Sequence, residues 1–188
     1  YGEFNGGIPD ENVMCNPNTL YGSYKHQGER MCQIWKREHG LEYVIMRPSA
    51  LYGTRDMVTR VISQMTKSAL TRNQITVQGP ENRLDFSNVT DVADAFARAA
   101  TIDVAANEIF NCTRGYGRTI LEAAELVRDT LGKGEIQTKP HDPFYPNRDT
   151  LNSDKIKKLL GWKPTVDIEQ GIPEYVEWFL QQKCYNEK

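Results

Sequence analysis

Apolar and polar positions along the chain follow two periods, which predict alternating helices and strands. Residues from about Asn18 to Glu38 have helical spacing, and Gly40 suits the left-handed turn that closes a helix. Apolar residues three and four positions apart predict a second helix from Met57 to Leu70. Short apolar runs predict strands at residues 42–46, 75–77 and 107–111. The pattern therefore predicts an α/β fold.

Capping signals mark the later helices. Thr90 can cap a helix over residues 91–100, because its hydroxyl can accept a backbone N–H of the first turn. Thr119 and Glu122 form a capping box for a helix that stops near Gly132. The last two helices are predicted at residues 154–160, after Ser153, and from about Asp167 onward.

Composition excludes several function classes. Of the 188 residues, 26% are charged and 39% hydrophobic, as in ordinary globular proteins. A net charge of −2 without a basic stripe argues against a nucleic-acid binder. No run of about 18 apolar residues occurs, so we expect no membrane span.

Cysteine and histidine usage argues against disulfides and metals. The cysteines form no Cys-x-x-Cys pair, which favours reduced thiols in a cytoplasmic protein, and they stand at Cys15, Cys32, Cys112 and Cys184. The three histidines share no ligand spacing. We therefore expect no metal site.

The first predicted helix carries a phenol and an ammonium four residues apart, at Tyr21 and Lys25. This spacing places both side chains on one helix face. A phenol has a reference pKa of about 10. One cation about 4 Å away, at an effective dielectric of about 20, contributes roughly 4 kcal/mol and would bring that pKa near neutrality. The pair is thus a candidate acid-base device, although a core tyrosine beside a solvated lysine would show the same spacing.

The neighbouring motifs are more specific than the spacing. They are Tyr1-Gly2, Pro17 before the helix, Tyr21 to Lys25 followed by Gly28-Glu29, Arg47-Pro48 through Gly53, and Asp85 through Asp94. In this order, the run resembles the extended short-chain dehydrogenase/reductase family, in its NAD-dependent nucleotide-sugar epimerase/dehydratase branch. The resemblance extends from Tyr1 to about Phe179.

The resemblance implies a fold and a division into domains. We expect the C-terminal part of a Rossmann-like, doubly wound parallel sheet and a smaller α/β substrate-binding domain. Residues 1–53 would complete the NAD-binding domain, and residues 54–188 would mainly form the substrate-binding domain, with about 83–111 packing back on the first part.

The glycine-rich turn that holds a dinucleotide pyrophosphate is not found in the sequence. Gly115 and Gly117 imitate it, but Ile120 stands at the third glycine position. In the family this turn precedes the stretch that begins at Tyr1. We therefore expect the chain to be the C-terminal portion of a longer protein, unless the upstream half is missing only from the sequence in hand.

The family also implies roles for individual residues. Tyr21 and Lys25 would be the catalytic pair and would contact the cofactor, NAD or alternatively NADP. Pro48 and Ser49, just after a strand, would line the nicotinamide pocket. Ala50 stands where many relatives carry an asparagine for the sugar nucleotide.

Two arginines are candidates for the substrate diphosphate, because a guanidinium matches phosphate oxygens in a bidentate geometry. Arg83 precedes the Leu84-Asp85 step, one position earlier than in relatives, and a surface role is equally open. Arg148 precedes the Leu-Gly-Trp segment at 160–162, as in the family's substrate domain.

The activity implied is epimerisation of a nucleoside-diphosphate sugar through a transient keto-sugar. A nucleotide-sugar 4,6-dehydratase, an NADPH-linked reductase, and a non-catalytic binding or dimerisation fragment are the alternatives. The resemblance also implies a homodimer through the Tyr21/Lys25 helix, where Tyr24, Met31 and Trp35 form an apolar stripe.

Overall fold

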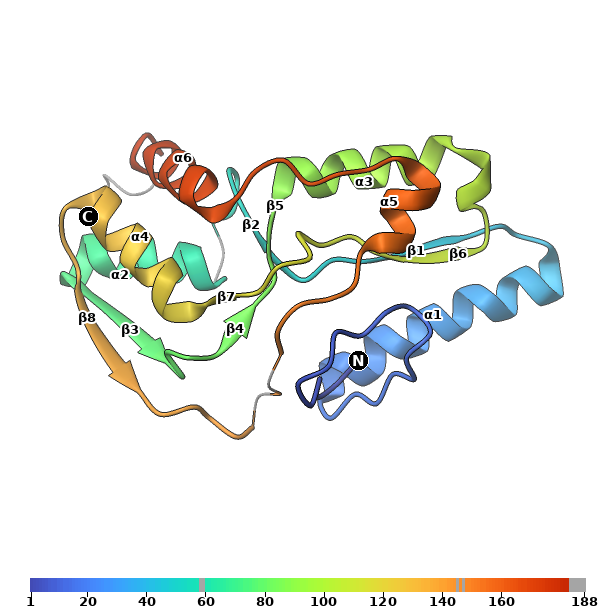
Figure 1. The fold of residues 1–188 in the computed structure, drawn as a ribbon, viewed down its shortest axis with the longest axis horizontal. Helices are drawn as coiled ribbons and strands as arrows, with labels where there is room; N and C mark the ends of the chain where they lie inside the picture. The colour runs from blue at the N-terminus through green and yellow to red at the C-terminus, as the bar shows by residue number, and fades with distance from the viewer. Residues whose placement is uncertain (58–59, 145, 147, 183–188) are drawn as a thin grey trace.

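The computed structural model describes residues 1–57, 60–144, 146 and 148–182 (Figure 1). Its helices are α1 (Leu20–His39), α2 (Val61–Arg72), α3 (Val89–Thr101), a 3-10 turn (Asp103–Ala105), α4 (Ile120–Leu131), α5 (Asp154–Leu160) and α6 (Ile168–Leu180). Its strands are β1 (Val44–Arg47), β2 (Ala50–Tyr52), β3 (Gln74–Gln78), β4 (Arg83–Leu84), β5 (Phe86–Asn88), β6 (Glu108–Asn111), β7 (Arg118–Thr119) and β8 (Glu135–Lys139).

Helix ends follow the capping chemistry closely. Gly40 and Gly132 close α1 and α4 in the left-handed conformation, and Thr119 and Glu122 form the predicted capping box. The prediction that Thr90 caps α3 is wrong. Asn88 is the cap, because its side-chain oxygen accepts the Thr90 backbone N–H at 2.9 Å.

The predicted start of the second helix at Met57 is also wrong, because α2 begins at Val61; residues 58 and 59 lie outside the described residues. Arg60 is in extended conformation just before the helix, and its backbone N–H donates to Ser63 Oγ at 3.1 Å. The apolar spacing gave the correct type of element but could not locate this cap.

Strand pairing among the described residues is mainly parallel. β1 pairs with β6, β2 with β5 and β3 with β8, all in parallel, whereas β4 pairs with β7 in antiparallel orientation. Parallel neighbours need long crossover connections, which explains why each of these strands finds its partner far along the chain. Arg47, the last residue of β1, lies opposite Asn111 of β6, so both strands end at the same edge.

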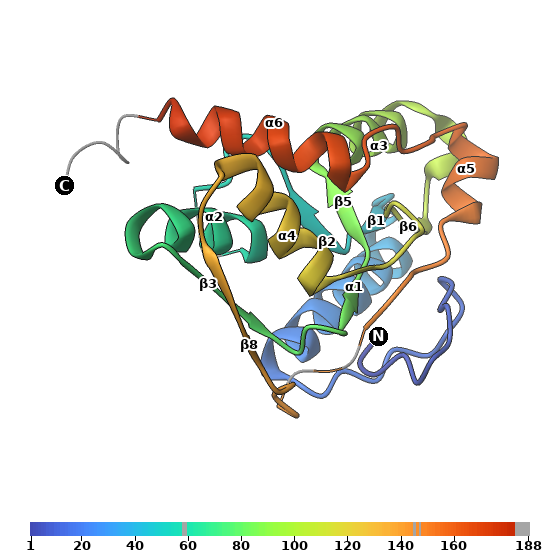
Figure 2. The ribbon, with the colours of Figure 1, turned by 60° about the vertical axis from the view of Figure 1, so that its left-hand side comes forward.

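Two buried clusters hold the helices on these strands. In one, α2, α4 and α6 pack together with β3 (Figure 2), and Ile62, Val127 and Val176 are buried there. In the other, α3 and α5 pack around Phe110 of β6 and the fully buried Trp162. The proposed domain boundaries remain a prediction.

Helix α1 contributes to neither cluster. It runs along one side of the molecule below β1 and β6 (Figure 1), and none of its residues is buried. Its exposed apolar side chains include Leu20, Tyr21, Tyr24, Met31, Ile34 and Trp35. Within the described part of the chain, no helix has both the length and the apolar character needed to cross a bilayer.

Candidate functional site

The first turn of α1 is fixed by its cap. The Thr19 hydroxyl accepts the Gly22 backbone N–H at 3.1 Å, and satisfies one of the free donors of the helix N-terminus. The Gly40 N–H closes the other end by donating to the Lys36 carbonyl at 2.9 Å. The local sequence therefore determines where the helix starts, and Tyr21 falls in its first turn.

Tyr21 and Lys25 lie on an open face of this helix. The Tyr21 side chain is 71% exposed and Lys25 is also exposed. Their helical positions are one turn apart, so the two side chains share a stripe. The phenol is accessible to a ligand, which the predicted acid-base role requires. The role itself stays a prediction.

An ion pair joins the same stripe to the end of β1. Arg47 donates from Nε to Glu29 Oε1 at 2.8 Å and from Nη2 to Glu29 Oε2 at 2.6 Å. Both side chains are largely shielded, with 13% and 19% exposure. Bidentate pairs of this kind are geometrically specific. The pair therefore attaches α1 to the edge where β1 and β6 end.

Arg47 also reaches the amino-terminal loop. Its Nη1 donates to the Tyr1 hydroxyl at 2.7 Å, and that hydroxyl donates to Asn111 Oδ1 at 2.7 Å. Burial raises the pKa of Tyr1 to about 12 despite the opposing charge of Arg47, so this phenol stays protonated and remains a donor. Burial would lower the pKa of Arg47, but its bonds to Glu29 and Tyr1 raise it overall.

Glu29 and Arg47 belong to the sequence motifs, but the motifs indicate no role for either residue. One signal was available. Glu29 is four residues after Lys25 and eight after Tyr21, so it continues their stripe. Its partner could not be read from the sequence, because the pair joins residues 18 positions apart.

The segment before α5 meets this edge as well. The Asn111 side chain donates to the carbonyls of Asn152, at 2.9 Å, and Pro9, at 3.2 Å. The Asn152 N–H donates to Pro9 at 3.0 Å. The end of β6, the amino-terminal loop and the chain that follows Arg148 are therefore joined.

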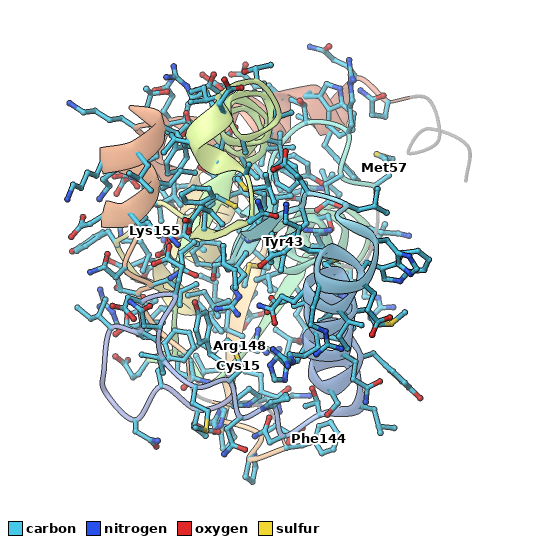
Figure 3. All side chains as sticks on the ribbon, turned by 90° about the vertical axis from the view of Figure 1, so that its right-hand side faces the viewer. Cys15, Tyr43, Met57, Phe144, Arg148 and Lys155 are labelled. Carbon is cyan, nitrogen blue, oxygen red and sulfur yellow. The ribbon has the colours of Figure 1, made fainter. Side chains whose placement is uncertain are left out.

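The two predicted phosphate ligands come from adjacent segments. Arg83, in β4, pairs with Asp149 Oδ1 at 3.3 Å and donates to the Gly117 carbonyl. Its guanidinium carbon lies 5.9 Å from the Tyr116 ring centroid. Arg148, labelled in Figure 3, is exposed and precedes Asp149 in the chain. The structure thus brings the 148–149 segment to Arg83, although part of the donor capacity of Arg83 is already used.

Buried Asp85 holds the loops around these arginines. Its carboxylate accepts the Gly115 N–H, at 3.0 Å to Oδ2, and the Leu151 N–H at 3.2 Å. Burial raises the pKa of Asp85, against the lowering effect of these hydrogen bonds. Asp85 therefore links β4 and β5 to both the 115–118 loop and the 149–152 segment.

A second cluster was missed by spacing rules. The ligand atoms of Cys15, His26 and Glu29 lie within 4.8 Å of one another, and all three residues are partly buried. Spacing rules apply to histidines or cysteines that recur at set intervals along the chain. Such rules do not detect a group that combines one cysteine, one histidine and one glutamate from separate segments. Cys184 lies outside the described residues.

Pro48 and Ser49 follow β1 directly. Pro48 is exposed and Ser49 is partly buried. In open α/β sheets, ligands bind beyond the carboxyl ends of the strands. Their position agrees with a ligand-facing edge, and their contact with a cofactor stays a prediction.

Comparison with known proteins identifies the family. Residues 1–113 match the model of the NAD dependent epimerase/dehydratase family. A putative UDP-glucose 4-epimerase of Methanocaldococcus jannaschii is 35% identical over 95% of this chain and 59% of its own length. A dTDP-glucose 4,6-dehydratase of Streptomyces niveus is 29% identical over 98% of this chain and 56% of its own. The chain thus spans a little over half the length of these relatives.

Solved structures of similar proteins support the same family assignment. The UDP-glucose 4-epimerase of Thermus thermophilus, in complex with NAD, superposes with a TM-score of 0.87 at 27% identity, covering 96% of this chain and 60% of that one. The Thermotoga maritima UDP-glucose 4-epimerase, with UDP-glucose, gives 0.81 at 29% identity, covering 92% and 60%. These matches confirm the predicted Rossmann-like α/β fold class. The chain belongs to the NAD-dependent epimerase/dehydratase family, whose cofactor is NAD.

Proposed function

We propose that the protein carrying this chain is an NAD-dependent epimerase that acts on a nucleoside-diphosphate sugar through a transient keto-sugar. One observation carries the proposal: Tyr21 and Lys25 share an exposed stripe of α1, whose next member, Glu29, is held by Arg47 at the ligand-facing end of β1. The relative with 35% identity is a putative UDP-glucose 4-epimerase, which favours epimerisation. The dTDP-glucose 4,6-dehydratase at 29% identity supports dehydration as the second candidate.

The residues of α1 would do the proton chemistry. Tyr21, ionised with the help of Lys25, would take a proton from a hydroxyl of the sugar. Lys25 would hold the phenolate and donate to a cofactor hydroxyl, because an ammonium offers three donors. When bound, NAD supplies the acceptor for the hydride that leaves the same carbon.

The chemistry of the donors fits one end of NAD. The Tyr21 hydroxyl and the Lys25 ammonium are open to hydrogen-bond with ribose hydroxyls, and the Ser49 hydroxyl stands at the edge where β1 ends. These residues therefore fit the nicotinamide riboside half of the cofactor, with Pro48 beside it.

The diphosphate of the substrate would lie between Arg83 and Arg148. Arg83 is held in place by Asp149 and by the Gly117 carbonyl. Arg148, exposed and next to Asp149, would add a second guanidinium from the neighbouring segment. Two guanidinium groups from neighbouring segments suit a diphosphate, which carries at least two negative charges.

The same helix offers a surface for a second subunit. Tyr24, Met31 and Trp35 are exposed at 68%, 58% and 49%, and successive members lie seven and four positions apart. An apolar stripe of this kind on an otherwise polar helix is typical of an interface. We propose a homodimer through α1.

The function can be tested with the purified protein. Isothermal titration with UDP-, GDP-, CDP- and dTDP-sugars, followed by product analysis in the presence of NAD, should show one preferred nucleotide and interconversion of two sugars without net reduction of NAD. Net oxidation of added NADPH would instead support a reductase, and loss of water a dehydratase. Binding without turnover would contradict the catalytic proposal and support a binding module.

A further inference from the structure

The cluster of Cys15, His26 and Glu29 has the composition and placement of a metal site. His26 and Glu29 are three residues apart on α1, so they project from one face. Cys15 comes from the loop that leads into this helix and is labelled in Figure 3. The three ligand atoms lie within 4.8 Å of one another. Two segments of the chain thus converge on one point.

The distances require little adjustment. In a tetrahedral zinc site the metal bonds are about 2.0–2.3 Å long, which separates neighbouring ligand atoms by roughly 3.3–3.8 Å. The present separations, up to 4.8 Å, would close with side-chain movements of about 1 Å. Such movements lie within the freedom of side chains that are only partly buried, as these three are.

The ligand types select the ion. Thiolate and imidazole are ligands of Zn²⁺ and similar transition metals, whereas Mg²⁺ and Ca²⁺ prefer oxygen ligands in greater number. One sulfur, one nitrogen and one carboxylate leave the fourth tetrahedral position to water. A thiolate and a carboxylate also match the two positive charges of the ion.

Arg47 orients the carboxylate of this set. It donates to both oxygens of Glu29, at 2.8 and 2.6 Å. Carboxylates that bind metals are commonly held by such outer hydrogen bonds, and each oxygen keeps a further lone pair for a ligand bond. The charge of Arg47 opposes the cation, so the site suits an exchangeable ion rather than a permanently held one.

We propose that Cys15, His26 and Glu29 bind Zn²⁺ and that the bound ion cross-links the 10–17 loop to α1. The proposal concerns binding and does not depend on the catalytic role proposed for Tyr21. An ion that binds only the folded protein also stabilises it by mass action. Zinc should therefore raise the thermal unfolding midpoint, and Mg²⁺ should not.

The test is titration of chelator-treated protein with Zn²⁺ in a calorimeter and with Co²⁺ as a spectroscopic substitute. We expect one equivalent to bind, with a thiolate-to-cobalt charge-transfer band. Cys15→Ser should remove the band, and Cys15→Ser and His26→Asn should each lower the affinity at least about tenfold. Cys32→Ser is the matched control, because Cys32 is an exposed thiol on α1 outside the cluster.

Circular dichroism of each variant without metal separates loss of a ligand from loss of the fold. The proposal is overturned if no stoichiometric binding occurs, or if Cys15→Ser binds as tightly as the parent protein. Equal losses in Cys15→Ser and Cys32→Ser would overturn it as well. Activity is not needed for any of these measurements, so their failure would leave the epimerase proposal intact.

Discussion

Glu29 could form an ion pair with either of two cations, Lys25 or Arg47. On a helix, Lys25 and Glu29 are four positions apart and could form an ion pair. Arg47 holds the Glu29 carboxylate through two hydrogen bonds instead. Glu29 therefore does not compete for Lys25 in its proposed role beside Tyr21. Arg47 and Glu29 would then be positioning residues, since neither is placed against the substrate.

This arrangement predicts opposite effects on the pH–rate profile. Arg47→Met leaves a carboxylate near Lys25, so the rise of kcat should move to higher pH by about 0.25 unit, the effect in water of one charge eight helical residues, or about 12 Å, from Tyr21. Glu29→Gln should move it to lower pH. The double variant Arg47→Met/Glu29→Gln has neither charge, so its pH–rate profile should return to that of the parent protein. If both single variants lose rate without a shift, the pair is only structural.

The reactivity of the cysteine thiols tests whether Cys112 is buried as the structure describes. Cys112 is fully buried, and burial raises its pKa to about 12. Because the thiolate is the reactive form, Cys112 should resist alkylation by iodoacetamide at pH 8 in the native protein. Exposed Cys32 is the internal control and should be modified first. Peptide mass mapping would show this order, and early labelling of Cys112 would contradict the described core.

Individual residues were predictable where the chemistry is local. The Thr119/Glu122 box and the closing glycines at 40 and 132 depend on neighbours within a turn, and the structure confirms them. The Arg47 and Glu29 pair and the Cys15 cluster depend on tertiary contacts between separate segments. A single sequence contains no direct signal for such contacts. The roles of Tyr21 and Lys25 remain predictions.

At the scale of elements, one buried carboxylate joins α3 to the start of α6. Asp91 accepts the backbone N–H groups of Thr165 and Val166, each at 2.9 Å, and the Thr165 hydroxyl at 2.8 Å. The indole of Trp162 donates to the Asp91 carbonyl at 2.8 Å. The predicted cap at Thr90 was wrong because Asn88, at the end of β5, stood in the better position.

Removal of this carboxylate should therefore be costly. Asp91→Ala leaves three donors without their acceptor, and we expect a loss of about 3 kcal/mol in the free energy of unfolding. Asp94→Ala, one turn later on the same helix, removes an exposed pair with Arg98 and should cost less than about 0.5 kcal/mol. Urea unfolding of both variants measures the difference. Equal losses would mean that the Asp91 contacts do not hold the two elements together.

The cap of α4 predicts a dependence on pH. A hydrogen bond from the Thr119 backbone N–H lowers the pKa of Glu122 below its ordinary value of 4.5. Its contribution to stability is therefore present above that value and is lost as the pH falls through the folded-state pKa. Glu122→Gln keeps a capping side chain but cannot titrate, so its stability should fall less on acidification. Identical acid profiles by circular dichroism would contradict this assignment.

In the molecule as a whole, α1 contributes to neither of the two buried clusters. Its long amphipathic pattern was readable from the sequence, but the pattern alone could not say that every residue of the helix stays unburied in this chain. The parallel pairs β1–β6, β2–β5 and β3–β8 follow the family fold that the ordered motifs implied. Strand partners were not predictable from periodicity, because pairing depends on crossovers.

The exposed stripe of α1 predicts self-association. Trp35→Glu places a charge in the proposed interface, so sedimentation should show a change from dimer to monomer. Leu180→Glu, at an exposed apolar position of α6, is the control and should leave the dimer intact. A monomeric parent protein, or a dimer that tolerates Trp35→Glu, would contradict an interface through α1.

Turnover of a Tyr21→Phe variant tests whether Tyr21 is the proton-transferring group. With NAD and the preferred nucleotide sugar, kcat should fall by about 10²–10⁴, the range for loss of a positioned acid-base group, while the affinity for the nucleotide sugar stays nearly unchanged. Tyr24→Phe, the neighbouring exposed tyrosine of α1, should keep its rate. Near-normal turnover in Tyr21→Phe would show that Tyr21 does not transfer the proton.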